Sequence, residues 1–73
     1  MMEDLHLLEK PIEQFQASNE FRNMCRINQF KTLNDIVNYR VSKLLEKPEF
    51  GMRILLELIH ILEKHHLEDF LKD

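Results

Sequence analysis

The chain has 73 residues, 44% of them hydrophobic, which allows one small domain near the lower size limit for a hydrophobic core. Its formal net charge of −3 argues against a dedicated nucleic-acid-binding protein, and no apolar run approaches membrane-spanning length. The single cysteine, Cys25, excludes an internal disulfide and is typical of a reducing cytoplasm. Met1–Lys10 is acidic and lacks the apolar stretch of a signal peptide, so we expect a cytoplasmic protein.

The charges are unevenly distributed along the chain. Residues 1–20 carry one basic and five acidic side chains, whereas residues 21–53 carry seven basic and three acidic ones. Residues 54–73 are acidic again, with two basic and five acidic side chains. An anionic partner would therefore bind the basic middle segment of the chain, residues 21–53.

The N-terminal part is expected to pack on a single helical domain. Met1–Lys10 is interpreted as an arm that packs its leucines on the domain formed by residues 11–73. Pro11–Gln16 is expected to open a short helical turn, because proline is tolerated in the first position of a helix. Ile12 and Phe15 would then face inward.

The next two helices have clear start signals. Ser18 or Asn19 is a good N-cap for a helix that runs to about Asn28. The i, i+3, i+4 rule places its apolar residues on one face: Phe21, Met24 and Cys25. Thr32 and Asp35 form a capping-box pattern at the start of a second helix. Its expected inward residues are Leu33, Ile36 and Val37.

A third helix, a tight turn and a long helix complete the predicted fold. The third helix, from about Arg40 to Glu46, is expected to bring three residues to the core: Val41, Leu44 and Leu45. Pro48 prevents this helix from continuing. Gly51 is expected to supply the free backbone where the long helix begins. The sequence thus predicts an all-α fold, a compact bundle of four to five short helices with a helix–hairpin–helix core.

The long helix is unusually apolar. Its polar residues gather in one narrow strip: Arg53, Glu57, His60 and Lys64. Its apolar residues span roughly 220°, whereas a one-sided surface helix needs little more than about 100°. The helix is therefore either central, or part of the arc meets a partner. The candidate partner-facing residues are Ile54, Leu56 and Ile59.

The sequence gives no indication of catalysis. It contains no Gly-rich phosphate loop, no paired catalytic carboxylates and no nucleophile motif. His60 and His65 lie five residues apart, which is poor helical spacing for a metal site. Cys25 is interpreted as a small buried apolar residue. We therefore expect no enzyme activity, no metal and no cofactor.

Several of these residues together resemble a known family. The series is Pro11-Ile12, Phe15, Asn23, Thr32-Leu33, Asp35-Ile36-Val37, Leu44-Leu45, Pro48, Phe50-Gly51, Leu55 and Glu57-Leu58. It resembles the C-terminal domain of the bacterial RNA polymerase α subunit, without a gap from about Leu7 to Leu67. The most specific part is the Leu-Leu-x-x-Pro-x-Phe-Gly hairpin, followed four residues later by Leu-x-Glu.

The resemblance implies a bundle of four short helices that binds the DNA minor groove at promoters and is contacted by transcription activators. An A·T-rich duplex is the expected DNA partner, and RNA polymerase or transcription regulators are the expected protein partners. The matching DNA-contact positions are Asn23, Arg26, Gly51 and Arg53, with Glu57 also retained. Arg22, one helical turn before Arg26, joins them as a candidate DNA-binding residue.

Three departures from the family keep a second hypothesis open. Glu20 stands where the family has its principal minor-groove arginine, Glu49 replaces a hairpin asparagine, and Ile54 replaces a serine. A carboxylate that faces phosphates is repulsive. The alternative is a homodimeric protein-interaction module that keeps the fold without DNA binding and uses the apolar surface of Ile54, Leu56 and Ile59.

Overall fold

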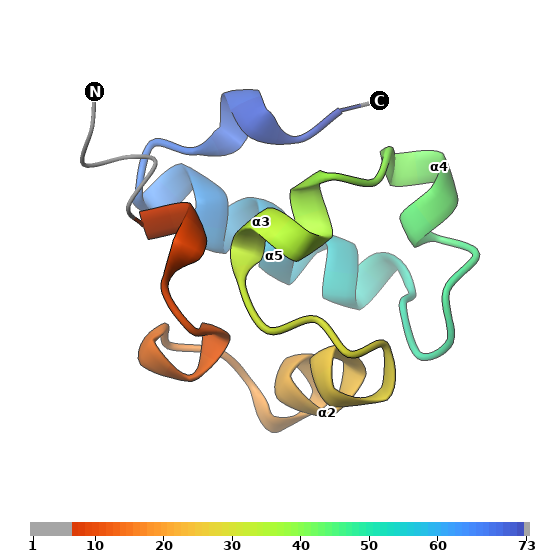
Figure 1. Ribbon diagram of the computed structural model, residues 1–73. Coiled ribbons are helices and arrows are strands. Elements are labelled where there is room, and N and C mark those ends of the chain that lie inside the picture. Colours follow the sequence, from red (N-terminus) through yellow and green to blue (C-terminus); the bar gives the residue numbers. More distant parts are fainter. Residues whose placement is uncertain (1–6, 73) are drawn as a thin grey trace.

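The computed structural model describes residues 7–72, and within them every regular element is helical (Figure 1). In chain order the elements are the 3-10 turn η1 (Ile12–Gln14), the α-helices α2 (Asn19–Ile27), α3 (Leu33–Val37), α4 (Val41–Leu44) and α5 (Met52–Lys64), and the 3-10 turn η2 (Glu68–Phe70). Two isolated β-bridges join Pro11 to Thr32 and Arg40 to Lys72. The predicted all-α bundle of short helices is confirmed.

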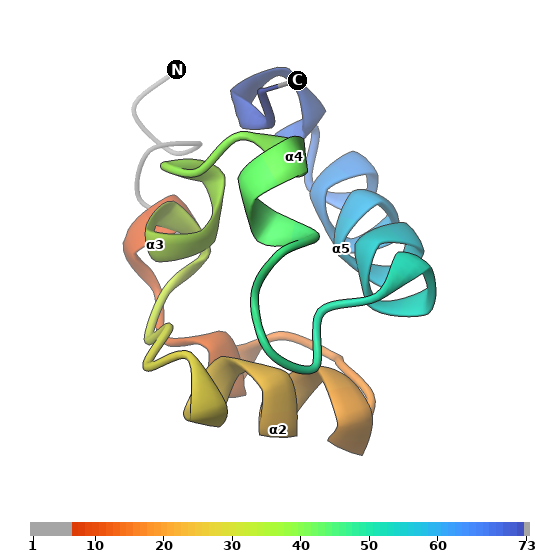
Figure 2. The same ribbon diagram turned by 90° about the vertical axis from the view of Figure 1, so that its right-hand side faces the viewer.

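The long helix α5 forms one side of the bundle, as Figure 2 shows. It packs against α2 and against η2. In Figure 1, α2 lies at the bottom of the molecule and η2 at the top. Figure 2, turned by 90°, places α3 and α5 on opposite sides with α4 between them. The hairpin, residues 47–51, returns the chain from α4 to the end of the molecule where α2 lies.

The core is apolar throughout residues 7–72, with no buried polar or charged side chain. Every element except η2 contributes buried side chains to it, and full burial of one such side chain stabilises the fold by about 1.5 to 3 kcal/mol. The largest fully buried side chains are Phe21, Met24, Leu33, Ile36, Leu44, Leu58, Leu62 and Leu67. Leu8 of the expected arm is also buried, whereas Leu5 lies outside the described residues.

Side chains cap the starts of α2 and α3 as predicted. The Ser18 hydroxyl accepts a hydrogen bond from the Phe21 N–H at 3.1 Å. The capping box before α3 is complete, because the Thr32 hydroxyl accepts from the Asp35 N–H at 3.3 Å and the Asp35 carboxylate accepts from the Thr32 N–H at 3.2 Å. These bonds satisfy amide groups that have no partner inside the helix. Both helix starts therefore follow from local sequence.

Helices α2 and α5 end in the same way. The residues after their C-caps are Gln29 and His66, with φ of 61° and 60°, in the left-handed region that usually favours glycine. The amide of the next residue donates to the carbonyl of Cys25 at 2.8 Å in α2 and of Leu62 at 2.7 Å in α5. This Schellman pattern stops each helix without a glycine.

In the hairpin, the residue with an unusual backbone conformation is not the glycine that the sequence predicted. The Phe50 N–H donates to the Lys47 carbonyl at 3.2 Å, and Glu49 has a φ of 62°. Gly51, the N-cap of α5, has a φ of −110° and a ψ of −172°, which any residue adopts. A Cβ at Gly51 would meet no atom within 4 Å. The conformational demand therefore falls on Glu49, at the turn position that type II turns give to Gly or Asn.

Helix α4 is shorter than predicted, which corrects the expected position of Leu45. The helix ends at Leu44, which is fully buried, and Leu45 is 40% exposed at its C-cap. Val41 is half-buried. Because the helix is a single turn, only one of its leucines reaches the core.

Two substitutions in the hairpin test whether Glu49, and not Gly51, is the position whose backbone angles favour glycine. Glu49→Gly is expected to raise the free energy of unfolding by about 0.5 to 1 kcal/mol, because glycine tolerates a positive φ. Gly51→Ser is expected to leave it unchanged or raise it by a few tenths of a kcal/mol, because serine is a good N-cap. Urea unfolding followed by circular dichroism measures both.

Glu49→Ala is the matched control for the first substitution, since it removes the same carboxylate and keeps a Cβ. It should give no comparable gain. A loss above about 1 kcal/mol in Gly51→Ser would show that the fold does require the glycine.

Candidate functional site

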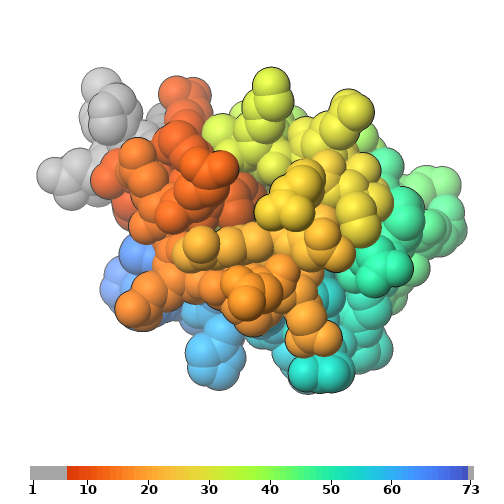
Figure 3. Space-filling model, turned by 90° about the horizontal axis from the view of Figure 1, so that it is seen from below, coloured from red at the N-terminus to blue at the C-terminus, as the bar shows by residue number. Residues whose placement is uncertain are grey.

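Helix α2 carries the first three candidate residues on its exposed side: Arg22, Asn23 and Arg26. Figure 3 shows this end of the molecule, with α2 (orange to yellow) crossing the face. The segment around η1 lies on one flank of α2, and the start of α5, in teal, lies on the other. Phe21, Met24 and Cys25 are buried on the opposite side of the helix, as predicted.

Hydrogen bonds hold α2 at both of its ends. Glu57 of α5 accepts the Ser18 N–H at 2.6 Å and the Ser18 hydroxyl at 2.7 Å. At the other end, the Asn28 side-chain amide donates to the Met24 carbonyl at 3.0 Å and to the Pro48 carbonyl of the hairpin at 2.9 Å. The exposed face of α2 is thus fixed relative to both α5 and the hairpin. Glu57, which the resemblance retained, has a structural role here.

An ion pair joins α2 to the first turn of α5. The Arg53 guanidinium lies 3.2 Å from the Glu20 carboxylate, and both side chains are largely exposed. An exposed pair of this kind contributes at most about 1 kcal/mol and opens readily. Glu20 therefore offsets the charge of one candidate DNA-binding residue directly.

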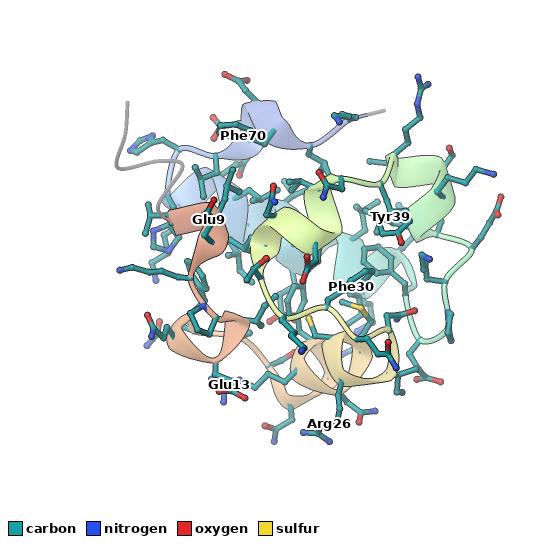
Figure 4. All side chains as sticks on the ribbon, viewed as in Figure 1. Glu9, Glu13, Arg26, Phe30, Tyr39 and Phe70 are labelled. Atoms are coloured by element: carbon teal, nitrogen blue, oxygen red, sulfur yellow. The ribbon has the colours of Figure 1, made fainter. Side chains whose placement is uncertain are left out.

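A groove lies on the other flank of α2, between this helix and the segment around η1. Its volume is about 750 Å³, and its charged lining residues are Glu13, Arg22, Arg26 and Lys31. Ile12, Cys25 and Phe30 are among its apolar lining residues. We call this the basic groove. Figure 4 shows Glu13 and Arg26 projecting from η1 and α2 at the bottom of the view, with Phe30 further inside.

Lys31 is the groove residue that sequence reasoning missed. The Ile12 N–H donates to the Lys31 carbonyl at 2.9 Å, and the adjacent bridge between Pro11 and Thr32 pairs the same two segments. This pairing places η1 beside Lys31, which follows α2 in the chain, and so forms the groove between η1 and α2. It joins residues about twenty apart in the chain, and no local pattern in the sequence indicates it.

The candidate DNA-binding residues therefore divide between two flanks of α2. Arg22 and Arg26 line the basic groove, and Arg22 also donates to the Phe15 carbonyl at 3.3 Å. Arg53 lies on the opposite flank with its acidic partner, and Gly51 begins the same helix. The structure does not gather the five residues into one cluster.

The candidate partner-facing residues also occupy different environments. Ile54 is only 7% exposed and belongs to the core, which corrects its placement on an exposed surface. Ile59 is half-buried against the core. Leu56 is 58% exposed and Met52, one turn earlier, is 63% exposed. The apolar surface of α5 is thus narrower than the sequence indicated, and Met52 and Leu56 dominate it.

Cys25 is held as a protonated thiol. It is 3% exposed, and its pKa is raised from 9.0 to about 12, first by burial and then by the negative charge of Glu57. A thiol with a raised pKa is a poor nucleophile and a poor metal ligand. Within residues 7–72, no three His, Cys, Asp or Glu side chains are grouped in a way that could hold a metal ion.

Comparison with known proteins finds no matching family model and no matching curated protein. The resemblance to the polymerase α C-terminal domain therefore stays a prediction that depends on the residues quoted for it. No helix in the described part of the chain has the length and apolar character needed to cross a bilayer.

The Cys25 thiol makes stability depend on pH in the alkaline range. Above about pH 9 the unfolded chain loses this proton, while the folded chain keeps it until about pH 12. The free energy of unfolding should therefore fall by up to about 1.4 kcal/mol per pH unit in this window. Urea unfolding from pH 8 to pH 11 measures the slope.

Cys25→Ala is the control for this slope. It should be less stable than the parent at pH 8 because it leaves a small cavity, but it should lack the thiol's part of the alkaline decline. Equal pH dependence in the two proteins would contradict the raised pKa.

Proposed function

We propose that the chain is a non-catalytic, transcription-associated docking module that binds A·T-rich duplex DNA through α2 and the hairpin. The observation that supports this most is Gly51. Its backbone angles suit any residue, and a Cβ there would meet no atom within 4 Å. A glycine that the fold does not need is accounted for by a partner that approaches the backbone closely.

The charges around Gly51 are mixed, because Arg53 attracts a phosphate there and Glu49, two residues before Gly51, repels it. The first amides of α5 have no partner inside the helix, and the positive end of the helix dipole lies there. Arg53 is in the first turn of α5, whereas Arg26 is exposed on α2 and lines the groove on the other flank of that helix. Phosphate contacts of this kind fix position and give affinity that falls with salt.

Glu20 limits the affinity that this arrangement provides. Its carboxylate lies 3.2 Å from Arg53 and repels phosphates. Because the pair is exposed, a phosphate can replace Glu20 as the partner of Arg53 at a cost of at most about 1 kcal/mol. Binding is therefore weak and salt-dependent, and Glu20 is the residue whose removal strengthens it.

Fluorescence anisotropy with a labelled A·T-rich duplex tests the proposal at about 50 mM and 200 mM salt. Arg26→Ala and Arg53→Ala are each expected to weaken binding by about three- to tenfold, and Gly51→Ser is expected to weaken it with the fold intact. Glu20→Gln should strengthen binding, because it removes the repulsion and frees Arg53. Each variant's thermal midpoint checks its fold.

Arg40→Ala is the matched control. It removes the same charge at the N-cap of α4, where the side chain makes no capping hydrogen bond, beside the bridge to Lys72. It should bind like the parent protein. No binding at about 50 mM salt, or an equal loss in Arg40→Ala, would refute the DNA proposal.

A second candidate function is self-association through α5. Met52 and Leu56 are both largely exposed and lie one turn apart on one face of this helix, with half-buried Ile59 one turn further. Exposed apolar surface of this kind is suited to a symmetric helix-to-helix contact. This homodimer would need neither Arg26 nor Arg53.

Leu56→Asp tests the homodimer by sedimentation velocity over a range of concentrations. The parent should show a mass that rises with concentration, and Leu56→Asp should remain monomeric because a carboxylate would be buried in the contact. Ile59→Asp is a weaker test, since Ile59 also packs on the core. Asn34→Asp, at an exposed position of α3 on the side of the molecule opposite to α5 (Figure 2), is the control that should behave like the parent. A monomeric parent at all concentrations would contradict self-association.

A further inference from the structure

Most of the side chains that line the basic groove take no part in the proposed DNA contact through the hairpin. Its volume is about 750 Å³, and its lining combines cations with apolar side chains. It lies on the flank of α2 that faces η1, whereas Arg53 and Glu20 pair from the other flank.

The charge of the basic groove is one-sided. Arg22, Arg26 and Lys31 line it, with Glu13 as the acidic lining residue, and all four side chains are exposed. The structure gives none of the three cations a carboxylate partner within residues 7–72, where the Arg53–Glu20 pair is the ion pair formed. A ligand for this groove therefore carries several negative charges.

The apolar part of the groove defines the ligand further. Ile12, Cys25 and Phe30 line the groove and are each at most 7% exposed, so the floor of the groove is the edge of the core. A phosphate backbone gains little from apolar surface, because its contacts are polar and charged. An apolar side chain that enters the groove gains by leaving water.

We propose that the basic groove binds an acidic peptide segment of a partner protein, with one apolar side chain placed against Ile12 and Phe30. The acidic residues on either side of this anchor pair with Arg22, Arg26 and Lys31. An apolar anchor surrounded by charged contacts is the usual arrangement of a protein interface. This interaction does not require DNA binding, and it shares Arg22 and Arg26 with the candidate DNA-binding residues.

The probe is a fluorescein-labelled synthetic peptide of sequence DDEDFEDLD, titrated with the full chain at about 50 mM salt. Lys31→Ala and Arg22→Ala are each expected to weaken binding at least about threefold, and Glu13→Gln to strengthen it. Arg53→Ala, which removes an equal charge on the other flank, should leave binding unchanged. Because Arg53→Ala should weaken DNA binding and leave peptide binding unchanged, the peptide proposal and the DNA proposal can each fail without the other.

Two control peptides test the two parts of the recognition. DDEDSEDSD keeps the charges and lacks the two apolar residues, either of which could be the anchor. NNQNFQNLN keeps the two apolar residues and lacks the charges. Each should bind at least about tenfold more weakly than DDEDFEDLD. Amide NMR spectra should show shifts for residues 12, 13, 22, 26 and 31 on addition of DDEDFEDLD.

The proposal is overturned by any of three results. The first is no binding of DDEDFEDLD at about 50 mM salt. The second is equal binding of DDEDFEDLD and DDEDSEDSD, which would reduce the groove to a charged surface. The third is a duplex DNA that binds in a manner dependent on Lys31 and displaces the peptide, which would assign the groove to nucleic acid.

Discussion

The position of α2 in the fold depends on Glu57 of α5, which binds Ser18, the residue immediately before this helix. Its two carboxylate oxygens accept the Ser18 N–H at 2.6 Å and the Ser18 hydroxyl at 2.7 Å, while the same hydroxyl accepts the Phe21 N–H. One side chain of α5 therefore both positions α2 and supports its N-cap. Hydrogen bonds to an ionised group are stronger than those between neutral groups. At the other end of α2, the Asn28 side-chain amide donates to the Pro48 carbonyl of the hairpin. The two attachments together fix the orientation of α2 about its own axis.

This attachment determines which surfaces α2 presents. One flank faces the start of α5, where Glu20 meets Arg53, and the other flank faces η1 and the basic groove. The positive charge of the middle segment is thereby divided between two surfaces. On the α5 flank an acidic neighbour offsets it, whereas in the groove three cations adjoin apolar side chains. This division is the physical reason for proposing two different ligands on one short helix.

Local sequence rules predicted the features that depend on neighbouring residues. The caps at Ser18 and Thr32 and the inward face of α2 follow from spacings of three and four residues, and the structure confirms them. Features that depend on distant segments were missed or misplaced. Ile54 is buried because of what packs on α5, and Lys31 lines the groove because the η1 segment pairs with it through Ile12. Neither contact leaves a local pattern.

The hairpin shows the same limit on a smaller scale. Glycine and proline marked the turn correctly, yet the positive φ falls on Glu49 and not on Gly51. The backbone angle at each position depends on how α4 ends and how α5 begins, and α4 ends about two residues earlier than its pattern indicated. The same difference explains why Leu45 is exposed.

A double-mutant cycle with Ser18→Ala, Glu57→Gln and the combined variant tests the attachment of α2 to α5 most directly. The four free energies of unfolding isolate the interaction between the two side chains from the loss of the cap itself. We expect a coupling free energy of about 1 kcal/mol, because the hydroxyl donates to an ionised carboxylate. A coupling indistinguishable from zero would contradict the claim that Glu57 holds α2 in place.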